Sequence, residues 1–451
     1  MFQRLAAKAT SLTQQYLPAP YLFSLLLTFL AAILAIFVTR TALADVVSYW
    51  YGGLWEILTF TTQMVLVLMC GHALVDAPAV RRVLDWFSSL PQTERQAGVL
   101  VFLVSWAAAL FNWGFCLVVA GVLVREIPKR LPTVSKGYLA AAGYTGFGVW
   151  ASGLSSSIAL VSATPGSPMN IIEQFAHRTV PLHETLLASY NIVPVLGMGV
   201  LMPLLFWRIH PSPGPSSAPS SAPSPSASVP SAEAEARETT PPAARTFAER
   251  IEQSRWITVL LVLMSLGYLF HRIRQGAFSL DLNLMIFLLL VIGWILHGTP
   301  IRYMQAFHGG ARAAGPLLLA YPMYGGILGL IRDTGLADWF AQLFVSFSTA
   351  QTLPFWSYIS SNVITLFVPS GGGHWAVQGP VMVKAAIALD ASLAKTAMAV
   401  AFGEQTGNLV QPFWALAIVS IAGLSIREMM GYCLLALGIA FPLFGLALLV
   451  L

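Results

Sequence analysis

Long apolar runs separated by short polar stretches dominate the chain. Nine of these runs suit helices that cross a bilayer, allowing for tilt and polar interruptions. They lie near 21–38, 57–75, 138–162, 184–207, 256–271, 283–297, 313–331, 396–421 and 429–451. Two further runs, 98–123 and 355–388, are apolar but interrupted. The pattern predicts an all-α polytopic membrane protein.

Composition supports this prediction. Only 10% of the 451 residues are charged, 57% are hydrophobic, and the mean hydropathy is +0.72. Such a chain has too few polar side chains to cover the surface of a water-soluble fold, which excludes a soluble enzyme. Although Ala42-Leu43-Ala44 resembles a signal-peptide cleavage site, the 18-residue run 21–38 favours a spanning helix.

The basic residues cluster at the ends of apolar runs, so the net charge of +5 describes topology and not a nucleic-acid partner. Both flanks of 98–123 are basic, with Arg95 on one side and Arg125 on the other, so both should be cytoplasmic. The run is therefore predicted to be a re-entrant hairpin, and 355–388 likewise. Two ordinary spanning helices remain the alternative. The N-terminus is then cytoplasmic and the C-terminus periplasmic.

This topology divides the chain into two membrane repeats. The first, 1–207, contains the hairpin 98–123 and a broken helix at 138–162, and the second, 272–451, contains the hairpin 355–388 and a broken helix at 396–421. Between them lie a cytoplasmic Pro/Ser-rich linker with a charged segment, 208–255, and a connecting transmembrane helix, 256–271. The linker has seven Pro and eight Ser between Pro211 and Pro230. One odd crossing inverts the second repeat, and inverted repeats with interrupted helices are typical of secondary transporters.

The two repeats also resemble each other in motif order. Phe111-Asn112-Trp113-Gly114 precedes Thr145-Gly146 in the first, and Phe367-Val368-Pro369-Ser370-Gly371 precedes Thr406-Gly407 in the second. The second tip continues through three glycines, which a helix does not accommodate cheaply beside proline. Irregular backbone at membrane depth must be buried in protein or line a cavity. The substrate site is therefore predicted at Ser370, Gly371, Gly372, Gly373, His374, Thr145 and Gly146, with the glycine amides holding a carboxylate. Close helix packing at the glycines and a structural hydrogen bond for His374 are the alternatives.

The motif Gly403–Asn408 places a glutamate inside an apolar run. An ionised glutamate at the membrane centre costs about 2.5–3.5 kcal/mol on insertion scales, so it needs a cation, a partner or a proton. The residues predicted to couple transport to a cation are Asn112, Gly114, Glu404, Gln405, Thr406, Gly407 and Asn408. A cap of the hairpin turn is the alternative for Asn112, and helix–helix hydrogen bonding is the alternative for Ser152, Ser155, Ser156 and Ser157.

Residues 367–384 (FVPSGGGHWAVQGPVMVK) and 403–412 (GEQTGNLVQP) resemble the short-chain fatty acid transporter family. That family is similar in organisation to the ion-transporter superfamily of secondary carriers. The resemblance implies uptake of short monocarboxylates, such as acetoacetate or butyrate, across the bacterial inner membrane. It also implies a homodimer with a scaffold domain and a mobile transport domain that moves as an elevator. The hairpin tips lack the superfamily's Ser-Asn-Thr signature, so its sodium ligands are not transferred residue by residue.

The hypothesis from the sequence is thus a carrier that binds a small carboxylate and couples its uptake to Na⁺ or H⁺, with Glu404 as the coupling residue in the proton-driven variant. It contains no catalytic residue, metal site or cofactor. No HExxH, Walker or GxSxG motif occurs in a suitable context. A channel or uniporter for small carboxylates, and an intramembrane acyl-transfer enzyme using His374 and Glu404, are the rival hypotheses. Cys70, Cys116 and Cys433 are predicted to be packing residues, and His72 and Asp76 to join an interfacial salt bridge with Arg81 and Arg82.

Overall fold

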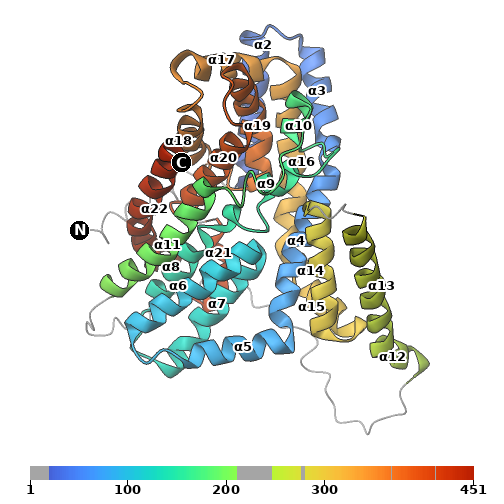
Figure 1. The fold of residues 1–451 in the computed structure, drawn as a ribbon, viewed down its shortest axis with the longest axis vertical. Helices are drawn as coiled ribbons and strands as arrows, with labels where there is room; N and C mark the ends of the chain where they lie inside the picture. Colours follow the sequence, from blue (N-terminus) through green and yellow to red (C-terminus); the bar gives the residue numbers. More distant parts are fainter. Residues whose placement is uncertain (1–19, 211–245, 276–279, 367, 412) are drawn as a thin grey trace.

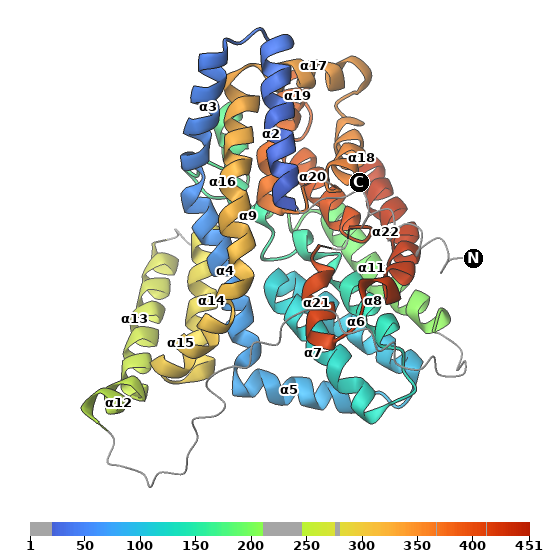
Figure 2. The same cartoon turned by 180° about the vertical axis from the view of Figure 1, so that it is seen from behind.

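The computed structural model describes residues 20–210, 246–275, 280–366, 368–411 and 413–451. Regular structure in these ranges is helical throughout, which confirms the all-α prediction (Figures 1 and 2). Most of the predicted linker lies outside the described residues, as do Phe367 and Pro412, which begin and end the two motifs that carry the family resemblance.

The helices follow one another along the chain without a strand between them in the described ranges. The first half contains α2 (Pro20–Phe37), α3 (Leu43–Glu56), α4 (Leu58–Asp76), α5 (Pro78–Ser89), α6 (Glu94–Phe111), α7 (Trp113–Arg130), α8 (Lys136–Phe147), η1 (Trp150–Ser152), α9 (Ser157–Ser162), α10 (Ile171–Ala176) and α11 (Ser189–Arg208). The second half contains α12 (Phe247–Glu252), α13 (Arg255–Arg274), α14 (Leu282–His297), α15 (Pro300–Gly309), α16 (Ala311–Asp333), α17 (Leu336–Phe347), α18 (Leu353–Ile364), α19 (Gly371–Ala388), α20 (Leu393–Gly407), α21 (Ala415–Ala422), η2 (Ile426–Glu428) and α22 (Met430–Val450).

Several helices are long and apolar enough to cross a membrane. Among the described residues these are Leu43–Asp76, Glu94–Phe111, Ser189–Arg208, Phe247–Arg274 and Met430–Val450. A sixth span results if α14 and α15, which meet at a bend of 120°, are counted together. The chain is accordingly a multi-pass membrane protein.

The helices gather into two lobes. The α16 lobe comprises α2, α3, α4 and α13 to α16, which pack on one another, with α13 at the outer edge (Figures 1 and 2). The α19 lobe comprises α6 to α11 and α18 to α22. Contacts between α16 and α19, and between α4 and α7, join the lobes, while α5 runs crosswise at one end (Figure 2). The helical breaks predicted from the sequence all lie in the α19 lobe.

The interruptions occur where two pairs of helices meet and inside two broken helices. Helices α6 and α7 pack side by side and are separated only by Asn112, and α18 is separated from α19 by residues 365–370. The first broken helix divides into α8, η1 and α9, and the second into α20 and α21. The backbone is thus interrupted between α6 and α7, between α18 and α19, and within the two broken helices.

The exact positions of two breaks differ from the prediction. Thr145 and Gly146 lie within α8, and Gln405, Thr406 and Gly407 lie within α20, so they form final helical turns and are not unwound. The helix α8 ends one residue after Gly146, at Phe147, and α20 ends at Gly407. The prediction placed the breaks at the glycines. A single glycine is tolerated in a helix at a cost of about 1 kcal/mol, so these glycines do not end the helices on their own.

The helix α3 was not predicted as part of a membrane span. It continues into α4 through Ile57, so that the predicted run 57–75 is only the second half of the stretch Leu43–Asp76. Asp45 and the glycine pair Gly52-Gly53 lower the hydropathy of α3, which hid it from a search for apolar runs. One face of α3 packs closely against α16.

That contact depends on glycines from both helices. A β-carbon on Gly325 of α16 would overlap the carbonyl oxygen of Gly53 and stand 2.7 Å from the side chain of Ile57. Gly329 meets Tyr49 in the same way, so the two backbones touch along two turns. At the end of the contact, the guanidinium of Arg332 donates to both carboxylate oxygens of Glu56 at 2.6 and 3.0 Å. The helices α3 and α16 are therefore held as one rigid pair.

The smaller predictions were also confirmed. Cys70, Cys116 and Cys433 are buried and unbonded to one another, as expected of packing residues. Arg81 donates to Asp76 at 2.7 Å, which is the predicted interfacial salt bridge. Within the charged segment before α13, α12 forms a short exposed helix.

Replacing Gly325 with alanine should destabilise the protein. The added methyl group would overlap backbone atoms of α3. Overpacking of this kind lowers the free energy of unfolding by about 1–3 kcal/mol. Thermal unfolding of the detergent-purified variant measures the effect as a lower midpoint temperature.

The matched control is Gly315→Ala in the same helix. A β-carbon at Gly315 has no neighbour within 4 Å among the described residues, so the substitution should be neutral or stabilising through helix propensity. Equal midpoints for the two variants would contradict a close α3–α16 contact.

Candidate functional site

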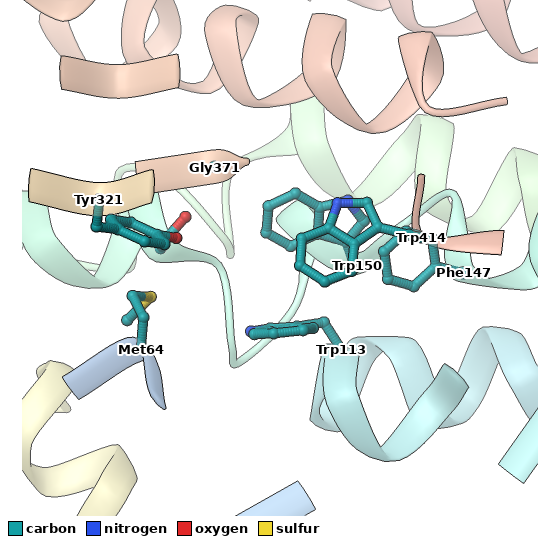
Figure 3. Close-up of a pocket in the computed structure, with 8 residues that line it drawn as sticks. Met64, Trp113, Phe147, Trp150, Tyr321, Gly371 and Trp414 are labelled. Carbon is teal, nitrogen blue, oxygen red and sulfur yellow. The ribbon is translucent and has the colours of Figure 1, made fainter. Parts of the chain in front are cut away.

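A narrow cavity lies where the two lobes meet. Its volume is about 20 Å³, enough for about one water molecule, and it is lined by Met64, Trp113, Phe147, Trp150, Ser157, Tyr321, Gly371 and Trp414. Met64 and Tyr321 come from the α16 lobe and the other residues from the α19 lobe. Figure 3 shows Met64 and Tyr321 on one side and Trp113, Trp150 and Phe147 on the other. Residues from both halves of the chain therefore form one largely apolar space.

The polar part of the cavity is at Gly371. A β-carbon on this residue would overlap the hydroxyl of Ser157 and stand 3.3 Å from Oε2 of Glu404. Glu404 is fully buried, and neither of its carboxylate oxygens has a hydrogen-bond partner among the described residues. The Ser157 hydroxyl likewise has none in that part of the chain. Because buried polar groups are normally bonded, this pair of residues marks a place where a ligand, a proton or a cation is expected.

The breaks of the two broken helices are bonded to each other beside this pair. The side-chain oxygen of Gln405 accepts hydrogen bonds from the amide of Ala151, at 3.1 Å, and the hydroxyl of Ser152, at 3.2 Å. Gln405 thus fixes the irregular segment between α8 and α9 against α20. It is a positioning residue, and its side-chain oxygen is already occupied.

Two of the three glycines at the α19 tip make close contacts with the α16 lobe. A β-carbon on Gly372 would overlap the ring of Phe60, and one on Gly373 would overlap the ring of Tyr324. Ser370 donates to the hydroxyl of Tyr321 at 2.8 Å. Close helix packing, the alternative given for the glycines, is thus present in the structure. Gly371, in the first turn of α19, nevertheless lines the cavity.

Asn112 is engaged by the turn in which it lies. Its side-chain oxygen accepts from the amide of Phe115 at 2.8 Å and caps α7, and its side-chain nitrogen donates to the carbonyl of Val67 at 3.4 Å. The next amide, of Trp113, donates to Ser155 at 2.9 Å. The structure confirms the cap reading of Asn112. Because this oxygen has a partner, Asn112 is a weak candidate for a cation ligand.

His374 is also satisfied by neutral groups. Its Nε2 lies 2.7 Å from the side-chain oxygen of Gln378 and 3.1 Å from the Ser361 hydroxyl, and its Nδ1 lies 3.3 Å from the Thr365 hydroxyl. These partners belong to α18, α19 and the residue after α18. The structural reading of His374 is therefore the better one, and the ring holds the two arms of the second helix pair together.

The remaining predicted residues divide into bonded and unbonded groups. The Thr406 hydroxyl donates to the carbonyl of Phe402 and to Asn362, while Gly407 packs on Thr365 and Gly146 packs on Ser105. Gly114 packs on Leu68 of α4. Asn408 donates to the Glu404 carbonyl at 2.6 Å. Its side-chain oxygen and the Thr145 hydroxyl are buried without partners among the described residues, so they remain available to a ligand.

Sequence reasoning missed most of the aromatic lining. Trp113 and Trp414 come from different repeats and meet edge to face with ring centroids 5.1 Å apart, and Phe147 and Trp150 stack beside them. Aromatic residues are frequent throughout this chain, so none of these positions stood out. Among the other lining residues, Gly371 was predicted as part of the site, and Ser157 carried a signal as part of the serine run after Thr145.

The whole sequence, residues 1–451, matches the protein family described as short chain fatty acid transporter. The chain belongs to this family. A protein of Escherichia coli (strain K12) named "Putative short-chain fatty acid transporter" is 34% identical over 439 residues, covering 97% of each chain. A protein of the same name from Haemophilus influenzae is 34% identical over 451 residues, covering 99% of each. The family resemblance seen in the sequence is confirmed, and a transporter rather than an enzyme is indicated.

Solved structures show the same fold at low sequence identity. MtrF of Neisseria gonorrhoeae, of a class of antimetabolite efflux pumps, is 16% identical with a TM-score of 0.55, covering 99% of this chain and 97% of that chain. The YdaH transporter of Alcanivorax borkumensis, which has an unusual topology, is 14% identical with a TM-score of 0.56, covering 95% and 98%. These similarities concern the fold alone.

Replacing Asn112 with alanine should lower stability without changing the ion on which function depends. Loss of an N-cap costs about 1 kcal/mol, and the Val67 carbonyl also loses its donor. Asn112→Ser keeps a capping oxygen and should lose less. Thermal unfolding measures the order of the three proteins, and transport under separate Na⁺ and H⁺ gradients measures ion dependence. A change of coupling ion in a stable Asn112→Ser variant would contradict the cap role.

Proposed function

We propose that this protein is a secondary active transporter that takes up short monocarboxylates, such as acetoacetate or butyrate, across the bacterial inner membrane. The observation that carries the proposal is the interior cavity with its apolar aromatic wall, beside which the unpartnered carboxylate of Glu404 is buried, with Oε2 3.3 Å from a β-carbon position on the lining residue Gly371. A short acid has the same two parts, an alkyl chain and a carboxyl group. The family of the chain supports this substrate class.

In this proposal the alkyl chain of the substrate lies against the aromatic side of the cavity, and its carboxyl group lies near Gly371. The amides at the start of α19 belong to Gly371, Gly372 and Gly373, and a helix N-terminus favours negative charge. Ser157 and the Ser370 end of the turn add hydroxyl groups, and Thr145 and Gly146 lie in the last turns of α8. No Lys, Arg or His lines the cavity in the described part of the chain. A charged acid would therefore need a cation with it.

The coupling ion is Na⁺ or H⁺, and Glu404 is the residue that meets it. A buried carboxylate without a protein partner is stabilised by either ion. The unpartnered oxygens of Asn408 and Thr145 come from the same two broken helices and are the further candidates for Na⁺ ligands. Asn112 and Gln405 take structural roles in this proposal, because their side-chain oxygens already accept hydrogen bonds.

The transport cycle we propose is an elevator movement. All four helical breaks lie in the α19 lobe, whereas the close α3–α16 pair makes the α16 lobe rigid. The cavity is shared between the lobes, so movement of one past the other would carry the substrate. The two units are inverted repeats with re-entrant hairpins, the N-terminus and linker are cytoplasmic, the C-terminus is periplasmic, and the protein is a homodimer in which the α16 lobe is the scaffold.

The proposal predicts concentrative uptake. Purified protein in liposomes should accumulate labelled acetoacetate above its outside concentration when a Na⁺ or an H⁺ gradient is imposed, and the two gradients are tested separately. Protein-free liposomes are essential controls, because undissociated short acids cross bilayers unaided. Flux that only equilibrates would instead indicate a channel or uniporter, and no flux above the control would contradict the substrate class.

Gly371→Ala should weaken uptake by about ten- to a hundredfold. Its methyl group would overlap Ser157 and lie 2.5 Å from the Trp150 ring, and an overpacking cost of about 1–3 kcal/mol corresponds to that range of affinity. The concentration dependence of uptake measures the loss.

Gly438→Ala in α22 is the matched control, because a β-carbon there has no neighbour within 4 Å among the described residues. The two variants should be compared at equal incorporation into liposomes. Unchanged uptake by a correctly folded Gly371→Ala variant would place the substrate elsewhere.

A further inference from the structure

Glu404 lies in a part of the protein without basic side chains. Lys395 is nine residues earlier in α20, or about 13 Å away at 1.5 Å per residue, and its ammonium group lies over the Tyr190 ring. Lys384 lies near the far end of α19 and donates to Asp338 at 2.6 Å. Neither lysine is placed to neutralise the Glu404 carboxylate. The cavity also has no basic lining residue in the described ranges.

The other titratable groups on elements around Glu404 are uncharged hydroxyl, imidazole and thiol groups. Tyr321 and Tyr324 of α16 are near enough to interact with Glu404 electrostatically. Around α20 the remaining groups are His374 of α19, Tyr358 of α18, Tyr190 of α11, and Tyr432 and Cys433 of α22. His374 is held by neutral partners and Tyr358 donates to the carbonyl of Phe441 at 3.0 Å. None of these groups offers Glu404 a positive charge.

A carboxylate substrate at Gly371 would therefore approach another carboxyl group. The Oε2 atom of Glu404 is 3.3 Å from the position of a β-carbon on Gly371, and Gly371 itself lines the cavity. Two carboxylates at such a distance cannot both be ionised in a dry site, whereas a carboxyl and a carboxylate form a short, strong O–H···O⁻ hydrogen bond. The Ser157 hydroxyl, at the same point, can donate to the remaining oxygen.

We propose that the protein recognises its acid through one proton shared between the substrate carboxyl group and Glu404. This inference rests on the proposed function, and it names the coupling ion as H⁺ and the recognised form as an acid–carboxylate pair. No covalent bond to carbon forms or breaks. The proton is bonded to one of the two carboxyl groups, that of the substrate or that of Glu404, and the other group accepts a hydrogen bond from it. The occluded pair carries one negative charge, and one proton accompanies each acid.

Substrate affinity should then fall as the pH rises. At a pH at which Glu404 is already protonated in the free protein, the substrate carboxylate binds without the uptake of a further proton. At higher pH a proton must be taken up with the acid, so affinity should decrease by up to about tenfold per pH unit, the slope for one linked proton. Calorimetric titration of the full chain in detergent with acetoacetate, between pH 5 and 9 and in buffers of different ionisation enthalpy, measures affinity and proton uptake together.

Glu404→Gln separates this mechanism from a general effect of pH. The amide can donate to the carboxylate as protonated Glu404 does, so binding should persist and become independent of pH, with no linked proton uptake. Glu252→Gln changes an exposed glutamate of α12 and should behave as the unchanged protein. If the glutamine variant does not fold, the proton uptake and the butyramide comparison below still decide the question in the unchanged protein.

Butyrate and its neutral amide, butyramide, provide the second test. Butyramide can donate to ionised Glu404 without an added proton, so its affinity should not fall with pH as that of butyrate does. A pH-independent butyrate affinity, an equal pH slope in Glu404→Gln, or binding that requires Na⁺ at constant pH would overturn the shared proton. Failure of every short acid to bind at any pH would instead contradict the proposed function.

Discussion

The burial of one carboxyl group, Glu404, constrains the centre of this protein. Removing an ionised carboxylate from water costs several kcal/mol even after the protein relaxes, so such groups are normally paired. The fold pairs its acidic groups elsewhere: Glu56 and Asp333 both bind Arg332 at the end of the α3–α16 contact. Glu404 has no equivalent partner among the described residues. Its position is therefore understandable only through something that binds there.

The two sides of the cavity differ in how they are held. On the α16 side, glycine contacts bring α3 and α16 to backbone distance, and an ion pair closes the contact. Between the lobes, the α19 tip meets aromatic rings at Phe60 and Tyr324, and hydrogen bonds from Ser370 to Tyr321 and from Asn112 to the Val67 carbonyl add polar contacts. Apolar contacts are non-directional, so this boundary can be re-formed at another register more readily than a network of directed bonds. Such a boundary suits two bodies that move past each other.

The sequence predicted the fold more completely than the site. Long apolar runs identified nearly every membrane helix, and glycine, proline and polar residues located the four interruptions to within a few residues. The helix α3 was missed because Asp45 and two glycines lower its hydropathy, and one of these glycines, Gly53, packs against α16. At the site, the rarity of a glutamate in an apolar run identified Glu404, whereas Trp113, Phe147, Trp150 and Trp414 resemble every other aromatic residue of the chain. The hydrogen-bond partners of Asn112, Gln405 and His374 depend on three-dimensional contacts. The spacing of residues along the sequence does not reveal those contacts.

Hydrogen bonds between the interrupted segments explain how an irregular site keeps its shape. Gln405 joins α20 to the segment between α8 and α9, the amide of Trp113 bonds to Ser155 of the same segment, and the indole of Trp414 donates to the carbonyl of Pro369 at 2.6 Å. Each bond links a break to another break, and all of them lie within the α19 lobe. Non-helical backbone inside a membrane protein needs such partners. The same bonds join the four breaks to one another, so Glu404 and its surroundings can move together in the proposed transport cycle.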